Sequence, residues 1–165
     1  MAYLLKAATR TFCSILSTPR ALKIFQSSGK EFNAGFTVLH HQAFINELRE
    51  MDLKQLTPKE IDTKDSYGQS AIWIACHENN LEAYTLLKKY KACLKQHDKQ
   101  NRTLLHASAY GKIPVIRNKI IQDLLQNGVD PKAQDVLGND MFKYIDTKDI
   151  ADIYIIPNDE YQRKI

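Results

Sequence analysis

Adjacent cysteines and histidines are the side chains of this sequence that could carry catalytic or metal chemistry. Cys76 precedes His77, and His40 precedes His41. A thiol beside an imidazole could pair a nucleophile with its base, but neighbouring residues of a helix point about 100° apart and do not face each other. A zinc site needs three or four ligands, which a single histidine pair does not supply. These pairs therefore predict neither a catalytic residue nor a metal or cofactor site.

The other chemical signals of the chain are sparse. The three cysteines, Cys13, Cys76 and Cys93, form no CxxC pair, which is typical of reduced thiols in the cytoplasm. The sequence contains no Gly-rich phosphate loop, HExxH or GxSxG motif. It thus predicts a protein that is not an enzyme, with a cryptic cysteine-dependent enzyme as the alternative. Inert, buried thiols would count against that alternative.

Length and composition favour a single helical domain or a short array of repeats. The chain has 165 residues, of which 44% are hydrophobic and 25% charged, the usual globular mixture. Six Gly and five Pro are too few for the many turns of a β-sandwich. The net charge of +4 is too small to indicate a specific nucleic-acid partner. No apolar run reaches the roughly 20 residues of a membrane span, so we expect a cytoplasmic protein.

The first 30 residues are basic. They contain Lys6, Arg10, Arg20, Lys23 and Lys30 and no acidic residue. Such a composition fits either a mitochondrial targeting segment or a basic capping helix, and we favour the capping helix because these residues also fit the repeat frame below. Binding of an anionic membrane or of nucleic acid through this segment is a further alternative function.

A repeated segment organises the middle of the chain. The segments Gly35–His40, Gly68–Trp73 and Asn101–His106 align with successive offsets of 33 residues, and the weaker copy Gly138–Lys143 follows after 37. Equal periods with matching residue types predict repeated structural units. Gly and Asn tolerate the positive φ of a tight turn. The four residues expected to cap the following helices are Thr37, Ser70, Thr103 and Asp140, and those expected in the core are Leu39, Ile72, Leu105 and Phe142.

At this point the sequence resembles the ankyrin-repeat family. Its pattern, Asp-x-x-Gly-x-Thr-Pro-Leu-His, is matched by Asp65–Gly68 with Ile72 and by Asp98–Thr103 with Leu105-His106. The resemblance implies an all-α solenoid of stacked helix-turn-helix units joined by β-hairpin-like turns. It implies a degenerate capping repeat at 1–33, repeats at 34–64, 65–97 and 98–134, and a degenerate repeat and tail at 135–165.

The chain departs from that pattern in several places. Trp73 and Lys143 stand where the family has histidine, whereas His40 and His106 are expected to bond neighbouring turns. The third repeat carries an insertion near Ile116–Ile121. The second helix of the first repeat is expected to end at Leu56-Thr57-Pro58. The recurring Asp65, Asp98 and Asp135 are interpreted as turn residues rather than catalytic acids.

In this family the turn tips and the concave side of the first helices bind partners. The resemblance therefore implies a non-catalytic module, monomeric when alone, that binds another protein. A role as a host-targeted effector or inhibitor, delivered by an intracellular bacterium or virus, is part of this hypothesis. Trp73 is interpreted either as core filling or as a binding hot spot. The expected contact residues are Phe36, Tyr67, Gln69, Trp73, His77, Lys99, Gln100, Arg102, Tyr110, Val136 and Leu137.

Overall fold

The computed structural model describes residues 35–145 of the chain. The capping repeat expected at 1–33, with its basic residues and Cys13, lies outside these residues, as does the tail after 145. Within the described range the backbone forms seven α-helices and one 3-10 helix, and no strand. None of these helices has the length and the apolar character needed to cross a membrane.

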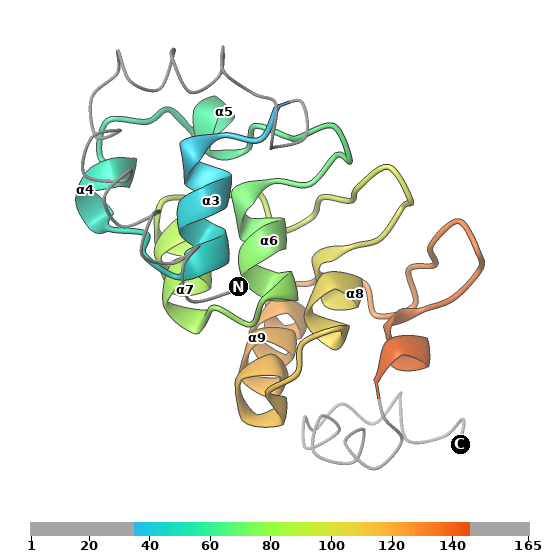
Figure 1. Cartoon of the computed structure of the whole chain (residues 1–165). Helices are drawn as coiled ribbons and strands as arrows, with labels where there is room; N and C mark the ends of the chain where they lie inside the picture. The colour runs from blue at the N-terminus through green and yellow to red at the C-terminus, as the bar shows by residue number, and fades with distance from the viewer. Residues whose placement is uncertain (1–34, 146–165) are drawn as a thin grey trace, which may run out of the picture.

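An inner row of short helices forms one layer of the molecule. It consists of α3 (Val38–Ile45), α6 (Ala71–His77), α8 (Leu104–Ala109) and the 3-10 helix η1 (Met141–Tyr144). These four helices follow one another side by side, and each contacts the next (Figure 1). The N-cap positions are Thr37, Ser70, Thr103 and Asp140, which confirms the four capping residues expected from the sequence.

Outer helices pack behind this row. They are α4 (Glu50–Leu53), α5 (Pro58–Ile61), α7 (Leu81–Lys89) and α9 (Pro114–Gln126). The insertion near Ile116–Ile121 lies inside α9, which has 13 residues against nine in α7. The expected helix end at Leu56-Thr57-Pro58 is wrong in detail. Thr57 caps a new helix, α5, and Pro58 occupies its first turn, where a missing N–H costs nothing.

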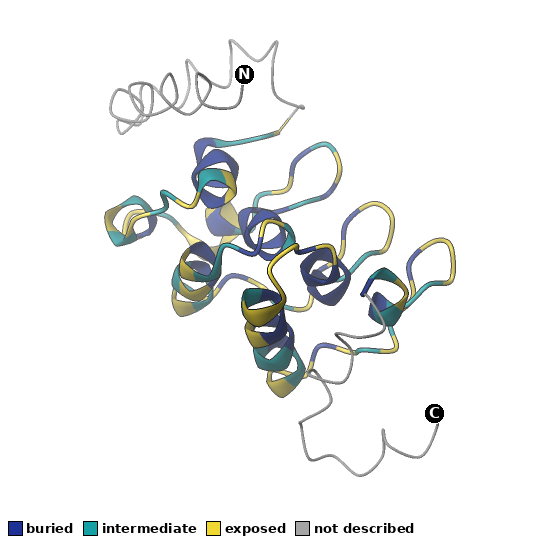
Figure 2. Cartoon of the chain, turned by 60° about the horizontal axis from the view of Figure 1, so that its bottom comes forward, coloured by how far each residue is buried: buried dark blue, intermediate teal, exposed yellow. Residues whose placement is uncertain are grey.

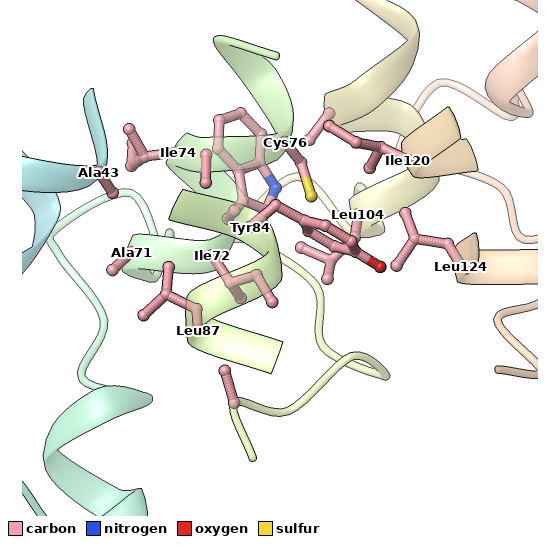
Figure 3. Packing of buried hydrophobic residues seen from close by; sticks show 14 of the residues in the cluster. Ala43, Ala71, Ile72, Ile74, Cys76, Tyr84, Leu87, Leu104, Ile120 and Leu124 are labelled. Atoms are coloured by element: carbon pink, nitrogen blue, oxygen red, sulfur yellow. The ribbon is translucent and has the colours of Figure 1, made fainter. Parts of the chain in front are cut away.

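The hydrophobic core lies between the two layers. Leu39, Ile72 and Leu105 are at most 7% exposed, as expected. In the fourth copy Met141 is fully buried and Phe142 is only partly buried, so the expectation for Phe142 was one position out of place. Tyr84 of α7 also packs into this cluster (Figure 3). Each fully buried Leu or Ile side chain contributes about 1.5–3 kcal/mol, so stacking neighbouring units is the main source of stability.

The result is an all-α solenoid of stacked helix pairs, as expected from the sequence. The segments that join one pair to the next project to the same side of the molecule as hairpin-like turns (Figures 1 and 2). Inner helices and turn tips therefore form one continuous face.

Candidate functional site

The turns owe their shape to one recurring aspartate. Oδ1 of Asp98 accepts hydrogen bonds from the backbone N–H of Gln100 (2.8 Å) and of Arg102 (3.0 Å). The N–H of Asp98 donates in return to the carbonyl of Arg102 (3.0 Å). Asp65 and Asp135 make the equivalent bonds in their own turns. These three carboxylates therefore stabilise the turns, in agreement with their interpretation from the sequence as turn residues.

Consecutive turns are also joined to each other through the backbone. The N–H of Lys99 donates to the carbonyl of Tyr67 (2.9 Å), and the N–H of Val136 donates to the carbonyl of Gln100 (3.0 Å). These bonds fix the spacing of the tips, while the side chains at the tips project outward. Tyr67 is 59% exposed and Leu137 is 77% exposed. Lys99, Gln100 and Val136 are exposed as well, and the tips are the exposed ends of the loops in Figure 2.

An aromatic row crosses the inner helices beside the tips. The rings of Trp73 and His77 stack with centroids 5.3 Å apart. His77 lies 5.7 Å from Tyr110, and Tyr110 lies 4.8 Å from Tyr144. This row, Trp73–His77–Tyr110–Tyr144, draws its members from α6, from the C-cap of α8 and from η1. Three successive units of the solenoid thus contribute to one surface.

Arg102 joins the aromatic row to the turn. Its guanidinium carbon lies 5.2 Å from the Trp73 ring centroid and 5.9 Å from that of Tyr110. Its Nε and one terminal nitrogen donate to Oδ2 of Asp98 at 2.8 and 2.6 Å. Burial works against the charge, but these bonds outweigh it and the pKa of Arg102 is raised. Arg102 is therefore a fixed cation rather than a mobile surface side chain.

Trp73 is part of the core, which decides between its two interpretations. Its side chain is 3% exposed, so it is not available to a partner at the surface, and the contact role expected for Trp73 is corrected. Its Nε1 has no hydrogen-bond partner. An indole is too large and too apolar at this helix position to remain outside the stacked layers. The buried Trp73 ring packs against the His77 ring and the Arg102 guanidinium, which lie nearer to the surface.

Histidines fill the position of Trp73 in the neighbouring units. Nε2 of His40 bonds the carbonyl of Gln69 at 2.9 Å, and Nε2 of His106 bonds the carbonyl of Asn139 at 3.1 Å. Both bonds join one helix to the next turn, as expected for structural histidines. His41 is also buried, and burial lowers its pKa. Within the described range no group of three or more His, Cys, Asp or Glu residues is placed to hold a metal ion.

The structure separates the expected contact residues into three groups. His77, Arg102 and Tyr110 come together in and beside the aromatic row. The exposed tips carry Tyr67, Lys99, Gln100, Val136 and Leu137. Phe36 and Gln69 are half-buried, and the ring of Phe36 lies 5.3 Å from that of His40, which is not a member of the aromatic row.

Tyr144 was missed by the sequence analysis. Its hydroxyl donates to Oδ2 of Asp135, which lowers the pKa of Asp135 to about 2 and raises that of Tyr144 to about 12. In the repeat register Tyr144 corresponds to Ala107, a buried position of α8. The repeat register therefore predicts a buried residue at Tyr144 and not a member of the aromatic row. The register fails here because η1 is a 3-10 helix, whose side chains project at different angles from those of an α-helix.

Of the two cysteines in the described part of the chain, Cys93 is exposed, and Cys76, the one beside a histidine, does not support the cysteine alternative. Cys76 is fully buried, and burial raises the pKa of its thiol to about 12. Nδ1 of His77 lies 2.8 Å from Oε1 of Glu78. The thiol is therefore neither ionised near neutral pH nor reachable by a substrate.

Comparisons with known proteins agree with this architecture. Residues 39–135 match the family model for ankyrin repeats, in three copies. The chain belongs to the ankyrin-repeat family. An ankyrin repeat protein of Acanthamoeba polyphaga mimivirus is 35% identical over 132 residues, which make up 79% of this chain and 46% of that relative. The chain thus spans less than half the length of the curated relative it matches. Ankyrin repeats are generally protein-interaction modules and typically non-catalytic.

Proposed function

We propose that this ankyrin chain is a non-catalytic module that binds a partner protein with its turn tips and with the adjoining aromatic row. The observation that carries this function is the arrangement of Tyr67, Val136 and Leu137. These three large apolar side chains are 59–77% exposed, yet they are held on turns whose backbones are bonded to one another or to a shared neighbour. Exposed apolar side chains on a rigid support lose little entropy on binding, so they are suited to be anchors.

The aromatic row supplies the second part of the same surface. His77 and Tyr110 are partly exposed and lie over the buried Trp73. Tyrosine and arginine are enriched at the centres of protein interfaces because they offer large contact area with a polar end. A partner that rests on the tips would reach these rings next, and the complex would contain one copy of the chain.

A capture experiment with two matched variants tests this function. The first variant is Tyr67→Ser/Val136→Ser/Leu137→Ser, which removes the anchors and leaves the backbone bonds of the turns. The control is Met51→Ser/Val115→Ser, which removes apolar side chains 61% and 67% exposed on outer helices. Arg102 is left unchanged because replacing it would leave the buried carboxylate of Asp98 without its counter-charge and would destabilise the fold. Fluorescence of Trp73, the single tryptophan, checks that all three proteins are folded.

We expect the wild type and the control to retain the same partner from a cell lysate and the tip variant to lose it. Retention of every partner by a folded tip variant would place the binding site elsewhere and overturn this function.

We further propose that the partner is a host protein, so that the chain acts as an effector or inhibitor. The support is the 35% identical viral relative, since a viral product acts inside a host cell. Capture from a lysate of Acanthamoeba, compared with capture from a lysate without host proteins, tests this role. A partner found only in the second lysate would exclude it.

A further inference from the structure

We propose that the partner presents an acidic, extended peptide segment to the turn tips, an inference that rests on the protein-binding function proposed above. The segment would lay carboxylates against Lys99 and Lys143 and an apolar side chain against Val136 and Leu137. All four of these residues are exposed. Their charges and spacing carry the inference.

The exposed charge of the tips is positive because the negative charge is turned inward. Asp65, Asp98 and Asp135 are only 4–7% exposed and accept hydrogen bonds from their own turns. By contrast, Lys99 and Lys143 are exposed and have no carboxylate within 4 Å among residues 35–145. The turn that carries Asp98 and Lys99 thus shows a partner the lysine and not the aspartate, and Lys143 adds a second exposed cation on η1.

Two lysines of the outer helix α7 are arranged differently. Nζ of Lys88 lies 2.6 Å from Oδ1 of Asp123, and Nζ of Lys89 lies 2.9 Å from Oε1 of Glu50. Their charges are compensated within the fold. Lys99 and Lys143, which have no such partner among the described residues, belong to the face that also carries the exposed apolar anchors, whereas Lys119, which is exposed and unpaired there as well, lies on α9 away from them. Opposite charge steers association and excludes partners of the same sign, so this face selects an acidic segment.

The spacing of the tips matches an extended chain. Packed helices lie about 8–10 Å apart, and a strand rises about 3.3 Å per residue, so about three residues of extended peptide span the distance from one tip to the next. A carboxylate opposite Lys99 therefore places an apolar side chain about three residues away opposite Val136 and Leu137. The chemistry expected of the segment is Asp or Glu, two intervening residues, then Leu or Phe.

Selection from a display library tests this chemistry without a known partner. The full chain is used to select from random peptides of about 16 residues, long enough to cross the tips in extended form. The affinity of each enriched peptide is then measured for the wild type and for Lys99→Gln, Lys99→Glu and the tip variant Tyr67→Ser/Val136→Ser/Leu137→Ser. Lys119→Glu serves as the control, because it makes the same charge change at an exposed position on α9.

We expect enriched peptides with an acid about three residues from a large apolar residue. Their affinity should fall about twofold in Lys99→Gln and about three- to tenfold in Lys99→Glu, and stay unchanged in Lys119→Glu. Neutral or basic peptides that are lost in the tip variant and indifferent to Lys99 would overturn the acidic segment and leave the protein-binding face standing. Peptides indifferent to the tip variant, or the absence of any enriched peptide, would count against both.

Discussion

The guanidinium of Arg102 lies 5.2 Å from the centroid of the Trp73 ring, at a place where neighbouring units use a hydrogen bond. His40 and His106, in the position of Trp73, each bond a carbonyl of the following turn. Trp73 has no such bond, and its Nε1 is left without a partner. In this unit the contact between the Trp73 ring and the Arg102 guanidinium therefore replaces the hydrogen bond that joins an inner helix to the following turn in the neighbouring units.

Arg102→Met should destabilise the protein by about 1–3 kcal/mol. The substitution removes the cation over Trp73 and leaves Asp98, whose side chain is 1% exposed, without its counter-charge. Urea unfolding followed by Trp73 fluorescence measures the loss. Arg49→Met, which breaks a pair whose arginine side chain is 56% exposed, should cost less than about 1 kcal/mol. Equal losses in the two variants would mean that Arg102 contributes no more than a surface ion pair.

Substituting alanine for Gly68 and, separately, for Gly138 distinguishes the cost of backbone strain from the cost of steric crowding. Both glycines have a positive φ, 78° and 77°, so either substitution should cost about 1–2 kcal/mol. A Cβ on Gly68 would also lie 2.9 Å from the backbone nitrogen of Lys99, whereas one on Gly138 has no neighbour within 4 Å. Gly68→Ala should therefore be the more destabilising substitution in urea unfolding, because the bond from Lys99 to Tyr67 must shift. If Gly68→Ala and Gly138→Ala have the same unfolding midpoint, the hydrogen bond from Lys99 to Tyr67 can shift without a measurable loss of stability.

The stability of the fold should decrease as the pH falls below about 6.5. Burial lowers the pKa of His40 from its ordinary value of 6.5, so the unfolded chain binds this proton more tightly than the native one. The contribution of His40 to the free energy of unfolding is complete above pH 6.5. It is lost as the pH drops from 6.5 toward the pKa of His40 in the folded protein, by at most about 1.4 kcal/mol per pH unit. The geometry agrees, because Nδ1 of His40 accepts from the N–H of Thr37 (3.2 Å) and a proton there would end that bond.

An NMR titration of the His40 ring is the direct measurement. A midpoint below 6.5 is expected in the native protein, and urea unfolding at pH 7.5 and 5.5 should show the matching loss. A midpoint at or above 6.5 would contradict both the burial effect and the acceptor role of Nδ1.

The two described cysteines should differ sharply in reactivity. Cys93 is exposed, whereas Cys76 is buried with its pKa raised to about 12. A maleimide at neutral pH should modify Cys93 at once and Cys76 only when urea unfolds the protein. Mass spectrometry of the digested protein distinguishes the two sites. Fast modification of Cys76 in the native state would restore the cysteine-dependent enzyme as a candidate function.

Local chemistry made the turns and helix starts predictable from the sequence. A cap such as Ser70 or Asp140 and a turn residue such as Asp98 act on amides within four positions, so their roles depend on neighbouring residues only. The start of α5 carried the same kind of signal. Thr57, Pro58 and Glu60 form a capping box with proline in the first turn, and interpreting this proline as a helix end overlooked the glutamate.

Contacts between distant units were the part that the sequence did not reveal. Whether Trp73 is buried depends on α3 and α8, which pack on either side of α6. Tyr144 belongs to the aromatic row because η1 packs against α8, which brings its ring to Tyr110. Each of these outcomes depends on how units pack together, and single-sequence patterns describe the units one at a time.

Because the bonds at the outermost tip positions run between backbone groups, the side chains at these positions can be exchanged independently of the scaffold. The bonds from Lys99 to Tyr67 and from Val136 to Gln100 use amide and carbonyl groups that every residue other than proline carries. Side chains at these four positions and at Leu137 can therefore be randomised together with little loss of folding. The chain is in that sense a template for recombinant binders, in which recognition is diversified on a row of fixed anchor points.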